Sequence, residues 1–296
     1  MGHIPVLLHE TIAALAPQMG ESYLDCTFNR GGHAVEIAKK IGPTGTIIGF
    51  DLDHVALEEG RKNVEETAGG PKVRPIETNF RHVQDVFKKE HFTPVHMLLA
   101  DLGLSSQELD VSGRGFTFQK DEPLVMTLST RIQDLTAYTV VNEWSEDSLA
   151  TILFGFADET YSKRIARAIV AARLISPIQT TRALREVIFQ SVPVSYRHGK
   201  IDCATKTFQA IRMAVNDEVG ALQDLLQACE HVVALGGRAS FITFHSVEDR
   251  IVKHFFTTQK DMWQAHTKKP VIPTDVETRI NPRSRSAKLR TYTKIM

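Results

Sequence analysis

The sequence lacks the patterns that mark membrane, secreted and zinc-binding proteins. Its 296 residues contain no uninterrupted apolar run of 18 residues and no secretory signal peptide, so neither membrane insertion nor secretion is expected. The three cysteines, Cys26, Cys203 and Cys229, form no C-x-x-C pair and no zinc-site spacing. Because few, scattered cysteines are typical of a reducing cytoplasm, we expect structural thiols in a cytoplasmic protein with no membrane partner.

Three enzyme signatures are also absent. No G-x-G-x-x-G occurs, which disfavours a nicotinamide-dependent oxidoreductase. There is no G-x-S-x-G, and His245, Ser246 and Asp249 lie too close together in the chain to form a hydrolase triad. Helix capping or a hydrogen bond to substrate explains His245 better. No histidines have H-x-x-x-H spacing beside an acid, so no metal site is expected.

The net charge of zero conceals a strong asymmetry along the chain. Residues 1–110 carry 10 basic and 16 acidic side chains, whereas residues 238–296 carry 12 basic and 5 acidic ones. The last 18 residues contain six basic side chains and no acid. Such a segment indicates a polyanionic partner, although a solvated tail that aids solubility explains it equally well.

The most informative segment, residues 22–41, predicts a strand, a glycine turn and a helix. Leu24, Cys26 and Phe28 are apolar or small, Gly31 and Gly32 allow a sharp turn, and apolar positions with helical spacing follow. This order is typical of the start of a nucleotide-binding βαβ unit. Since the dinucleotide phosphate cradle is missing, a cofactor with adenosine but no phosphate fits better. S-adenosylmethionine (AdoMet) is the obvious candidate.

A carboxylate at the end of the next apolar run supports an adenosine site. Asp51 ends the segment 46–51 and follows Gly31 by 20 residues, near the spacing at which an acid meets the ribose hydroxyls. The alternative is that Asp51 caps the following helix. Asp53 can provide that cap instead, which favours the ribose role for Asp51.

The wider pattern predicts an α/β fold with a helical insertion. Strands expected at 22–28, 46–51, 73–78 and 95–101 alternate with helices, which is typical of a parallel sheet covered on both faces. From 111 to 205 the pattern is helical, with segments near 134–142, 145–155, 159–173 and 180–190. After 205 we expect two helices, of which the second ends at Gly236-Gly237, then a strand at 238–244, a helix at 245–256 and a loop at 257–281. The predicted domains are therefore 1–110 with 206–296, and 111–205.

Asp101 is the strongest candidate for chemistry. It ends a nearly all-apolar strand and enters a turn of small residues, and ligands of open α/β sheets bind beyond the carboxyl ends of the strands. Methyl transfer to an aromatic amine needs such an acceptor, because the amine lone pair is conjugated into the ring. An acceptor that holds the N–H bonds orients the amine for attack. The alternative is a turn or helix-capping acid.

Eight separated blocks resemble the RsmH (MraW) family of ribosomal RNA small-subunit methyltransferases. The resemblance runs in order from residue 3 to residue 290. The blocks are HIPVLLHE (3–10), TFNRGGH (27–33), DLGLSS (101–106), RGFTF (114–118), ATKTFQAIR (204–212), VNDE (215–218), FHSVEDRIVK (244–253) and NPRSRSAKLR (281–290).

The resemblance implies a fold, an activity and a cofactor site. The implied fold is a Rossmann-like AdoMet-dependent methyltransferase domain with an inserted all-helical domain. The implied reaction moves a methyl group from AdoMet to the exocyclic N4 of a cytidine in the decoding region of small-subunit ribosomal RNA. The implied AdoMet contacts are Gly31, Gly32, His33, Asp51, Phe80, Asp101 and Glu108, with Asp101 as the catalytic residue and Phe80 against the adenine.

The resemblance also implies an RNA partner, within an assembled or nearly assembled small subunit. Methylating a base amine requires an unstacked base, so aromatic side chains such as Phe116 or Phe118 are candidates for stacking. A homodimer stays open as an assembly state. The residues expected to contact RNA are Arg114, Phe118, His245, Arg283, Arg285, Lys288 and Arg290.

Four places depart from the family pattern. Asn29 replaces a glycine, although asparagine tolerates left-handed backbone angles. Glu108 replaces the cofactor-binding glutamine, and Asp202-Cys203 replaces His-Pro. The stretch 123–129 has lost two acids and an arginine, at Val125, Thr127 and Ser129. We expect catalysis through Asp101 to survive and RNA positioning to change. A catalytically weakened RNA-binding assembly factor that retains the fold is the alternative.

Overall fold

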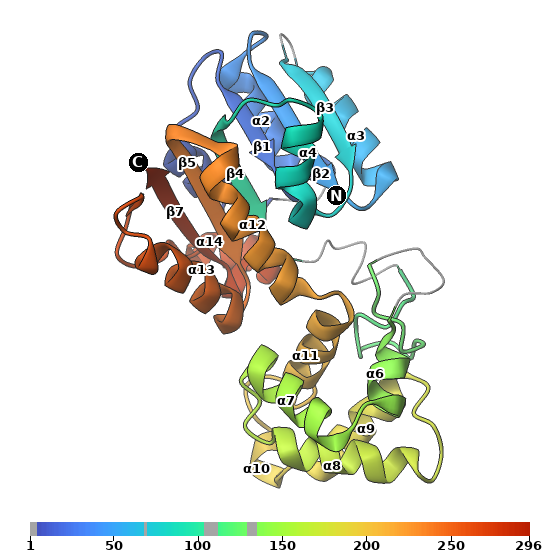
Figure 1. The fold of residues 1–296 in the computed structure, drawn as a ribbon. Helices are drawn as coiled ribbons and strands as arrows, with labels where there is room; N and C mark the ends of the chain where they lie inside the picture. The colour runs from blue at the N-terminus through green and yellow to red at the C-terminus, as the bar shows by residue number, and fades with distance from the viewer. Residues whose placement is uncertain (1–4, 68–69, 104–111, 129–134) are drawn as a thin grey trace. The chain divides into compact units, whose positions relative to one another are not determined.

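The computed structural model describes residues 5–67, 70–103, 112–128 and 135–296. The chain forms two compact units, one of residues 1–103 with 220–296 and one of residues 104–219 (Figure 1). The helical unit is thus longer at both ends than the predicted insertion, 111–205. Helix α11 (Thr205–Val215), which we expected in the α/β domain, belongs to it because Phe208 and Ile211 are buried in the helical core.

A seven-stranded sheet forms the first unit, in the order β3-β2-β1-β4-β5-β7-β6. The first five strands are parallel, as predicted, and β7 pairs antiparallel with both β5 and β6. The direction of strand order reverses between β1 and β4, which is where ligands bind in open α/β sheets. The strands are β1 (Ser22–Asp25), β2 (Thr46–Asp51), β3 (Lys72–Glu77), β4 (Val95–Asp101), β5 (Val233–Thr243), β6 (Trp263–Ala265) and β7 (Lys288–Lys294).

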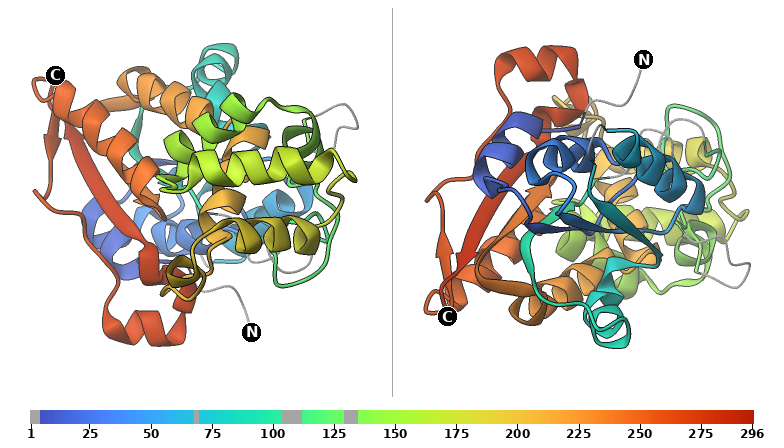
Figure 2. Two further views of the ribbon diagram at one scale, coloured as in Figure 1. Left: turned by 90° about the horizontal axis from the view of Figure 1, so that it is seen from below. Right: turned by 90° about the horizontal axis from the view of Figure 1, so that it is seen from above.

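Helices cover both faces of this sheet. Alternate residues of a strand point to opposite faces, so Leu98 and Leu99 of β4 enter different apolar cores. The core on one side packs against α4 (Val83–Lys89), α12 (Glu218–Val232) and α13 (Ser246–Thr258). The core on the other side packs against α1 (Leu8–Leu15), α2 (Gly32–Ile41) and α3 (His54–Glu65). Figure 2 (right) shows these two groups, blue and teal-to-orange, on either side of the sheet.

The C-terminal part of this unit differs from the expectation. The predicted loop 257–281 contains β6 and the helix α14 (Asp275–Ile280), followed by the 3₁₀ turn η2 (Pro282–Ser286). Strand β5 begins at Val233 and includes Gly236, at which we expected a helix to end. The basic terminal segment is not a solvated tail, because β7 lies inside the sheet between β5 and β6. The secondary structure of this region depends on pairing with strands that are distant in the chain, and local sequence does not indicate such pairing.

The second unit contains a non-helical stretch at 112–128 and several helices. Its helices pack around one apolar core, which includes Leu149, Ile165 and Leu184. No described helix in either unit is both long and apolar enough to cross a membrane. The helices are α6 (Ala137–Glu143), α7 (Glu146–Ala157), α8 (Ser162–Arg173), α9 (Thr181–Ser191), α10 (Val194–Arg197) and α11.

Candidate functional site

The turn after β1 is tight and lies directly against α3. Gly31 has a φ of 73° and forms the N-cap of α2. Asn29 has a φ of 46°, so asparagine adopts the left-handed backbone at this departure from the family pattern, as expected. A Cβ at Gly60 in α3 would stand 2.6 Å from the Asn29 carbonyl oxygen. The close packing of α3 on this turn therefore requires a residue without a Cβ at position 60.

Asp51 braces this turn from the end of β2. Its Oδ2 accepts a 2.7 Å hydrogen bond from the Asn29 amide, and its Oδ1 accepts one of 2.9 Å from the Asp53 amide. Asp53 is the N-cap of α3 and accepts from the amides of Val55 and Ala56, so the helix does not depend on Asp51 for its cap. A carboxylate can accept ribose hydroxyls as well as backbone amides.

His33 and Phe80 have different surroundings at this edge of the sheet. The buried His33 ring has its Nε2 3.0 Å from the Val6 carbonyl oxygen, so its imidazole holds the segment before α1. Because the ring is engaged in this way, we expect His33 to contact a cofactor through its backbone amide, in the first turn of α2. Phe80 opens the 3₁₀ turn η1 (Phe80–His82) and packs at the margin of a sheet core, half-buried.

Asp101 ends β4 beside β1, at the predicted edge. Its Oδ1 atom is buried and has no hydrogen-bond partner within the described part of the chain. Burial, followed by the negative charges of Asp25 and Glu248, raises the pKa of Asp101 to about 7. A buried carboxyl oxygen without a partner is costly unless a ligand satisfies it. The carboxyl is therefore suited to accept a proton or a hydrogen bond from a bound substrate.

Asp25 and Thr27 connect β1 to Asp101, and our sequence analysis missed both. Asp25 is buried, accepts from the Tyr23 hydroxyl at 2.8 Å and from the Thr27 amide at 3.1 Å, and has a pKa raised to about 6, mainly by burial. The Thr27 hydroxyl accepts a 2.8 Å bond from the Asp101 amide. One sequence signal could have identified Asp25. It is an acid at the end of an otherwise apolar strand, next to the glycine turn.

The arrangement suits a cofactor that carries adenosine. The β1 turn has no side chain at Gly31 or Gly32, the Asp51 carboxylate faces the same loop, and an unsatisfied carboxyl oxygen lies one strand away at Asp101. All of them lie at the carboxyl ends of β1, β2 and β4, at the point where strand order reverses. These residues fit the predicted cofactor.

The basic residues near the C-terminus divide into two groups. Arg283 and Arg285 lie exposed on η2. Arg290 is buried on β7 and donates to both oxygens of Asp249, at 2.7 and 3.2 Å, while Lys288 Nζ lies 3.3 Å from Asp249 Oδ2. The guanidinium of Arg290 is thus engaged inside the protein. We remove Arg290 from the expected RNA-binding residues.

His245 is the N-cap of α13, which is one of the two roles expected for it. The Nδ1 atom of His245 accepts from the Glu248 amide at 3.3 Å. Its Nε2 lies 3.1 Å from Glu248 Oε1, within ion-pair distance but without hydrogen-bond geometry to any described residue. Asp249 points to β7, because two cations attract its carboxylate there.

Two expected RNA contacts lie in the helical unit and make internal contacts there. Arg114 donates to the Thr127 carbonyl at 2.9 Å and lies 5.3 Å from the centre of the Phe116 ring. The Phe118 ring packs edge-on against Phe208 at 5.0 Å. The stacking of Phe118 on a base stays a prediction.

The departures from the family pattern have partial explanations in this unit. Val125 and Met126 belong to a turn in which Met126 has a φ of 54° and is buried, so this stretch packs without its lost charges. Asp202 receives two bonds from Arg185, at 3.1 and 2.6 Å, and accepts from the Ala204 amide at the start of α11. Glu108 and Ser129 lie outside the described residues.

Sequence relatives identify the family of this chain. The MraW methylase family model matches residues 1–295. A ribosomal RNA small subunit methyltransferase H from Symbiobacterium thermophilum is 41% identical over 99% of this chain and 96% of that protein. The protein of the same name from Thermosipho melanesiensis is also 41% identical, over 99% and 98%.

Comparison of folds gives a more distant similarity. The crystal structure of a putative rRNA methylase from Clostridium thermocellum matches with a TM-score of 0.45 and 10% identity, over the full length of both chains. The family assignment therefore rests on the sequence relationship, which covers nearly every residue. By that relationship, the chain belongs to the MraW methylase family.

Proposed function

We propose that this protein transfers a methyl group from AdoMet to the exocyclic N4 of a cytidine in the decoding region of small-subunit ribosomal RNA. One observation carries the proposal: the Asp101 carboxyl has a buried, unpartnered Oδ1 atom and a raised pKa, beside a glycine turn suited to adenosine. The names of the relatives support the same class of substrate.

The residues of the site suggest how the reaction proceeds. Bound AdoMet supplies an electrophilic methyl group on a sulfonium. Asp101 accepts a hydrogen bond from the N4 amine, which directs the nitrogen lone pair toward that methyl carbon. When the amine is methylated, Asp101 would take the proton that the nitrogen loses. A pKa near 7 makes Asp101 a stronger base than an ordinary aspartate, yet leaves it substantially ionised at neutral pH.

The remaining contacts in the proposal follow the geometry of each residue. Asp51 accepts the ribose hydroxyls, and the backbone at Gly31 and Gly32 approaches the cofactor closely. Phe80 packs against the adenine. Among the basic residues, the exposed Arg283 and Arg285 are the strongest candidates for RNA phosphates.

The deciding experiment uses labelled AdoMet and small ribosomal subunits that lack the methylation, followed by nucleoside mass spectrometry. We expect N4-methylcytidine from the wild type and none from Asp101→Ala. A different methylated nucleoside would refute the proposed specificity.

The second candidate is a catalytically weakened assembly factor that binds RNA and retains the fold. The loss of charge at Val125 and Thr127 favours it. AdoMet binding by calorimetry without any transfer to subunits is its expected result. Val125→Asp restores one of the charges lost from 123–129. Equal turnover in that variant and the wild type would show that this charge does not affect methyl transfer.

A further inference from the structure

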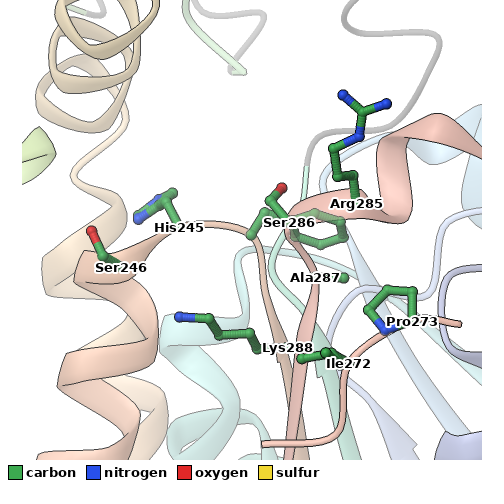
Figure 3. A pocket seen from close by; sticks show the side chains of 9 residues that line it. His245, Ser246, Ile272, Pro273, Arg285, Ser286, Ala287 and Lys288 are labelled. Atoms are coloured by element: carbon green, nitrogen blue, oxygen red, sulfur yellow. The ribbon is translucent and has the colours of Figure 1, made fainter. Parts of the chain in front are cut away.

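A pocket beside the Asp101 turn brings together cations, polar groups and apolar surface. It encloses about 310 Å³ in the α/β unit. Figure 3 shows His245 and Ser246 at the start of α13 on one side, and Arg285 and Ser286 at the end of η2 on the other. The remaining lining residues are Phe244, Ile272, Pro273, Ala287 and Lys288.

Sheet topology explains why this pocket lies at the catalytic edge. Strands β4 and β5 are parallel with Asp101 opposite Ile242, so both of their carboxyl ends reach the same edge. Strand β7 runs antiparallel to β5 with Lys288 opposite Thr243, so the start of β7 and the preceding η2 come to that edge too. The Phe244 ring, which lines the pocket, also lies against Gly103 in the turn after Asp101.

The charges around the pocket favour an anion. Arg285 is exposed at its rim, and Lys288 lines its wall. Two acids lie in the first turn of α13. Asp249 is held by Lys288 and Arg290, and Glu248 Oε1 lies 3.1 Å from His245 Nε2, so the cations Arg285, Lys288 and Arg290 outnumber the two carboxylates by one.

The apolar part of the pocket favours a ligand that carries apolar surface as well as negative charge. Phe244, Ile272 and Pro273 offer a ring and aliphatic surface next to the cations. A volume of 310 Å³ is within the range of sites that enclose a small organic ligand. A nucleotide in a single strand presents both chemistries, a phosphate and a sugar with its base.

We infer that this pocket is a subsite for one nucleotide next to the methylated cytidine, with its phosphodiester held by Arg285 and Lys288. The inference rests on the proposed function, because it takes the substrate strand to cross the edge at Asp101. It adds a specific role: the subsite fixes the position of the strand so that the target base, once unstacked, reaches Asp101.

The test measures binding of a short single-stranded RNA with a central cytidine, by fluorescence anisotropy without AdoMet. We expect Arg285→Gln to weaken binding about 10-fold at moderate salt, because a charge-assisted phosphate contact is lost. The slope of log affinity against log salt should fall by about 0.7, the value for one phosphate on a single strand. Arg285→Lys should retain the slope and recover part of the affinity.

A matched control separates the pocket from general positive charge. Lys268 lies exposed in a loop of the same unit and does not line the pocket. Lys268→Gln removes the same charge, and we expect it to change affinity less than about 2-fold. An equal loss in the two variants would overturn the inference.

RNAs with a single neutral methylphosphonate linkage identify the phosphate. One linkage beside the cytidine should weaken binding to the wild type strongly and binding to Arg285→Gln less, because only the Lys288 contact remains to be lost in that variant. Equal sensitivity at every linkage, or no detectable RNA binding, would refute the subsite. Inorganic phosphate that binds the wild type tightly while no single linkage matters would make the pocket a free-anion site. Methyl transfer by the wild type to ribosomal subunits is measured separately, so failure of the proposed function is distinguishable from failure of the subsite.

Discussion

Asp101 combines a functional requirement with a cost in stability. Its carboxyl is buried among other acids, and its raised pKa records how unfavourable the charged form is there. Since the folded pKa lies above the unfolded one, folding favours the protonated form. The stability associated with Asp101 is therefore fully present below the unfolded pKa and is lost as pH rises through the folded pKa of about 7.

Asp101→Asn should remove this cost together with the activity. At pH 8 we expect the variant to unfold at a higher temperature than the wild type, with a gain of about 1–3 kcal/mol, because a neutral amide replaces a buried charge. At pH 3, where the carboxyl is protonated in the folded and unfolded chains alike, the two proteins should be nearly equal. Thermal unfolding at both pH values checks this, and a variant less stable than the wild type at pH 8 would show that the charge is well solvated.

Asp25 should set the pH dependence of the reaction. Wild-type methyl transfer is expected to rise with pH through about 7, as Asp101 ionises. Asp25→Asn removes a neighbouring negative charge, so the pKa of Asp101 should fall and the rising limb should move to lower pH by about half a unit or more. A pH–rate profile of single-turnover transfer provides the measurement. An unchanged midpoint with a reduced plateau would assign Asp25 a purely structural role.

At the scale of elements, two helix-interior glycines illustrate why position outweighs propensity. Gly60 in α3 faces the glycine turn, where a Cβ would stand 2.6 Å from the Asn29 carbonyl oxygen. Gly155 in α7 is exposed and has open space around its Cβ position. The same substitution should therefore act in opposite directions at these two sites.

Gly60→Ala should separate α3 from the turn and lower both stability and AdoMet affinity, whereas Gly155→Ala should stabilise the helical unit by up to ~1 kcal/mol. Denaturant unfolding and calorimetry with AdoMet measure the two effects. If Gly60→Ala bound AdoMet as tightly as the wild type, close packing of α3 on the turn would be unnecessary for the cofactor site.

The link between α13 and β7 is an ion-paired contact that predicts a further stability effect. Burial alone would raise the pKa of Asp249, but the bonds and charge of Arg290, with those of Lys288, outweigh it and lower that pKa. A lowered carboxyl pKa gives stability that is present above the unfolded pKa and is lost as pH falls through the folded one.

Arg290→Gln should accordingly cost about 1–3 kcal/mol at neutral pH, since Asp249 loses its main partner. The difference from the wild type should shrink in acid as Asp249 becomes protonated. Urea unfolding at pH 7 and pH 3 tests this. Unchanged stability with weakened RNA binding would return Arg290 to the RNA-contacting residues.

At the scale of the whole molecule, sequence predicted the parallel half of the sheet well and its antiparallel end poorly. The spacing of Gly31 and Asp51 and the apolar strand that ends at Asp101 are local patterns, so they were readable. Strand β7 was not, because its strand form depends on pairing with β5 and β6. The resemblance implied that Arg290 contacts RNA and did not reveal its partner inside the protein. Its partner Asp249 lies 41 residues away in the chain.

Removing residues 288–296 should abolish folding of the α/β unit. The deletion takes β7 out of the middle of the sheet, exposes the edge of β5 and leaves β6 without its neighbour. We expect aggregation or loss of the cooperative thermal transition in circular dichroism. Removing only Ile295 and Met296, which follow β7 and are exposed, is the control and should leave the transition intact.

The position of β7 has a consequence for how the protein is made. A ribosome synthesises β7 after β5 and β6, although the sheet needs it between those two strands. Until β7 emerges and pairs, β5 presents an open edge, and a neighbouring nascent chain can pair with it. The yield of the α/β unit in the cell should therefore depend on what shields that edge in the interval.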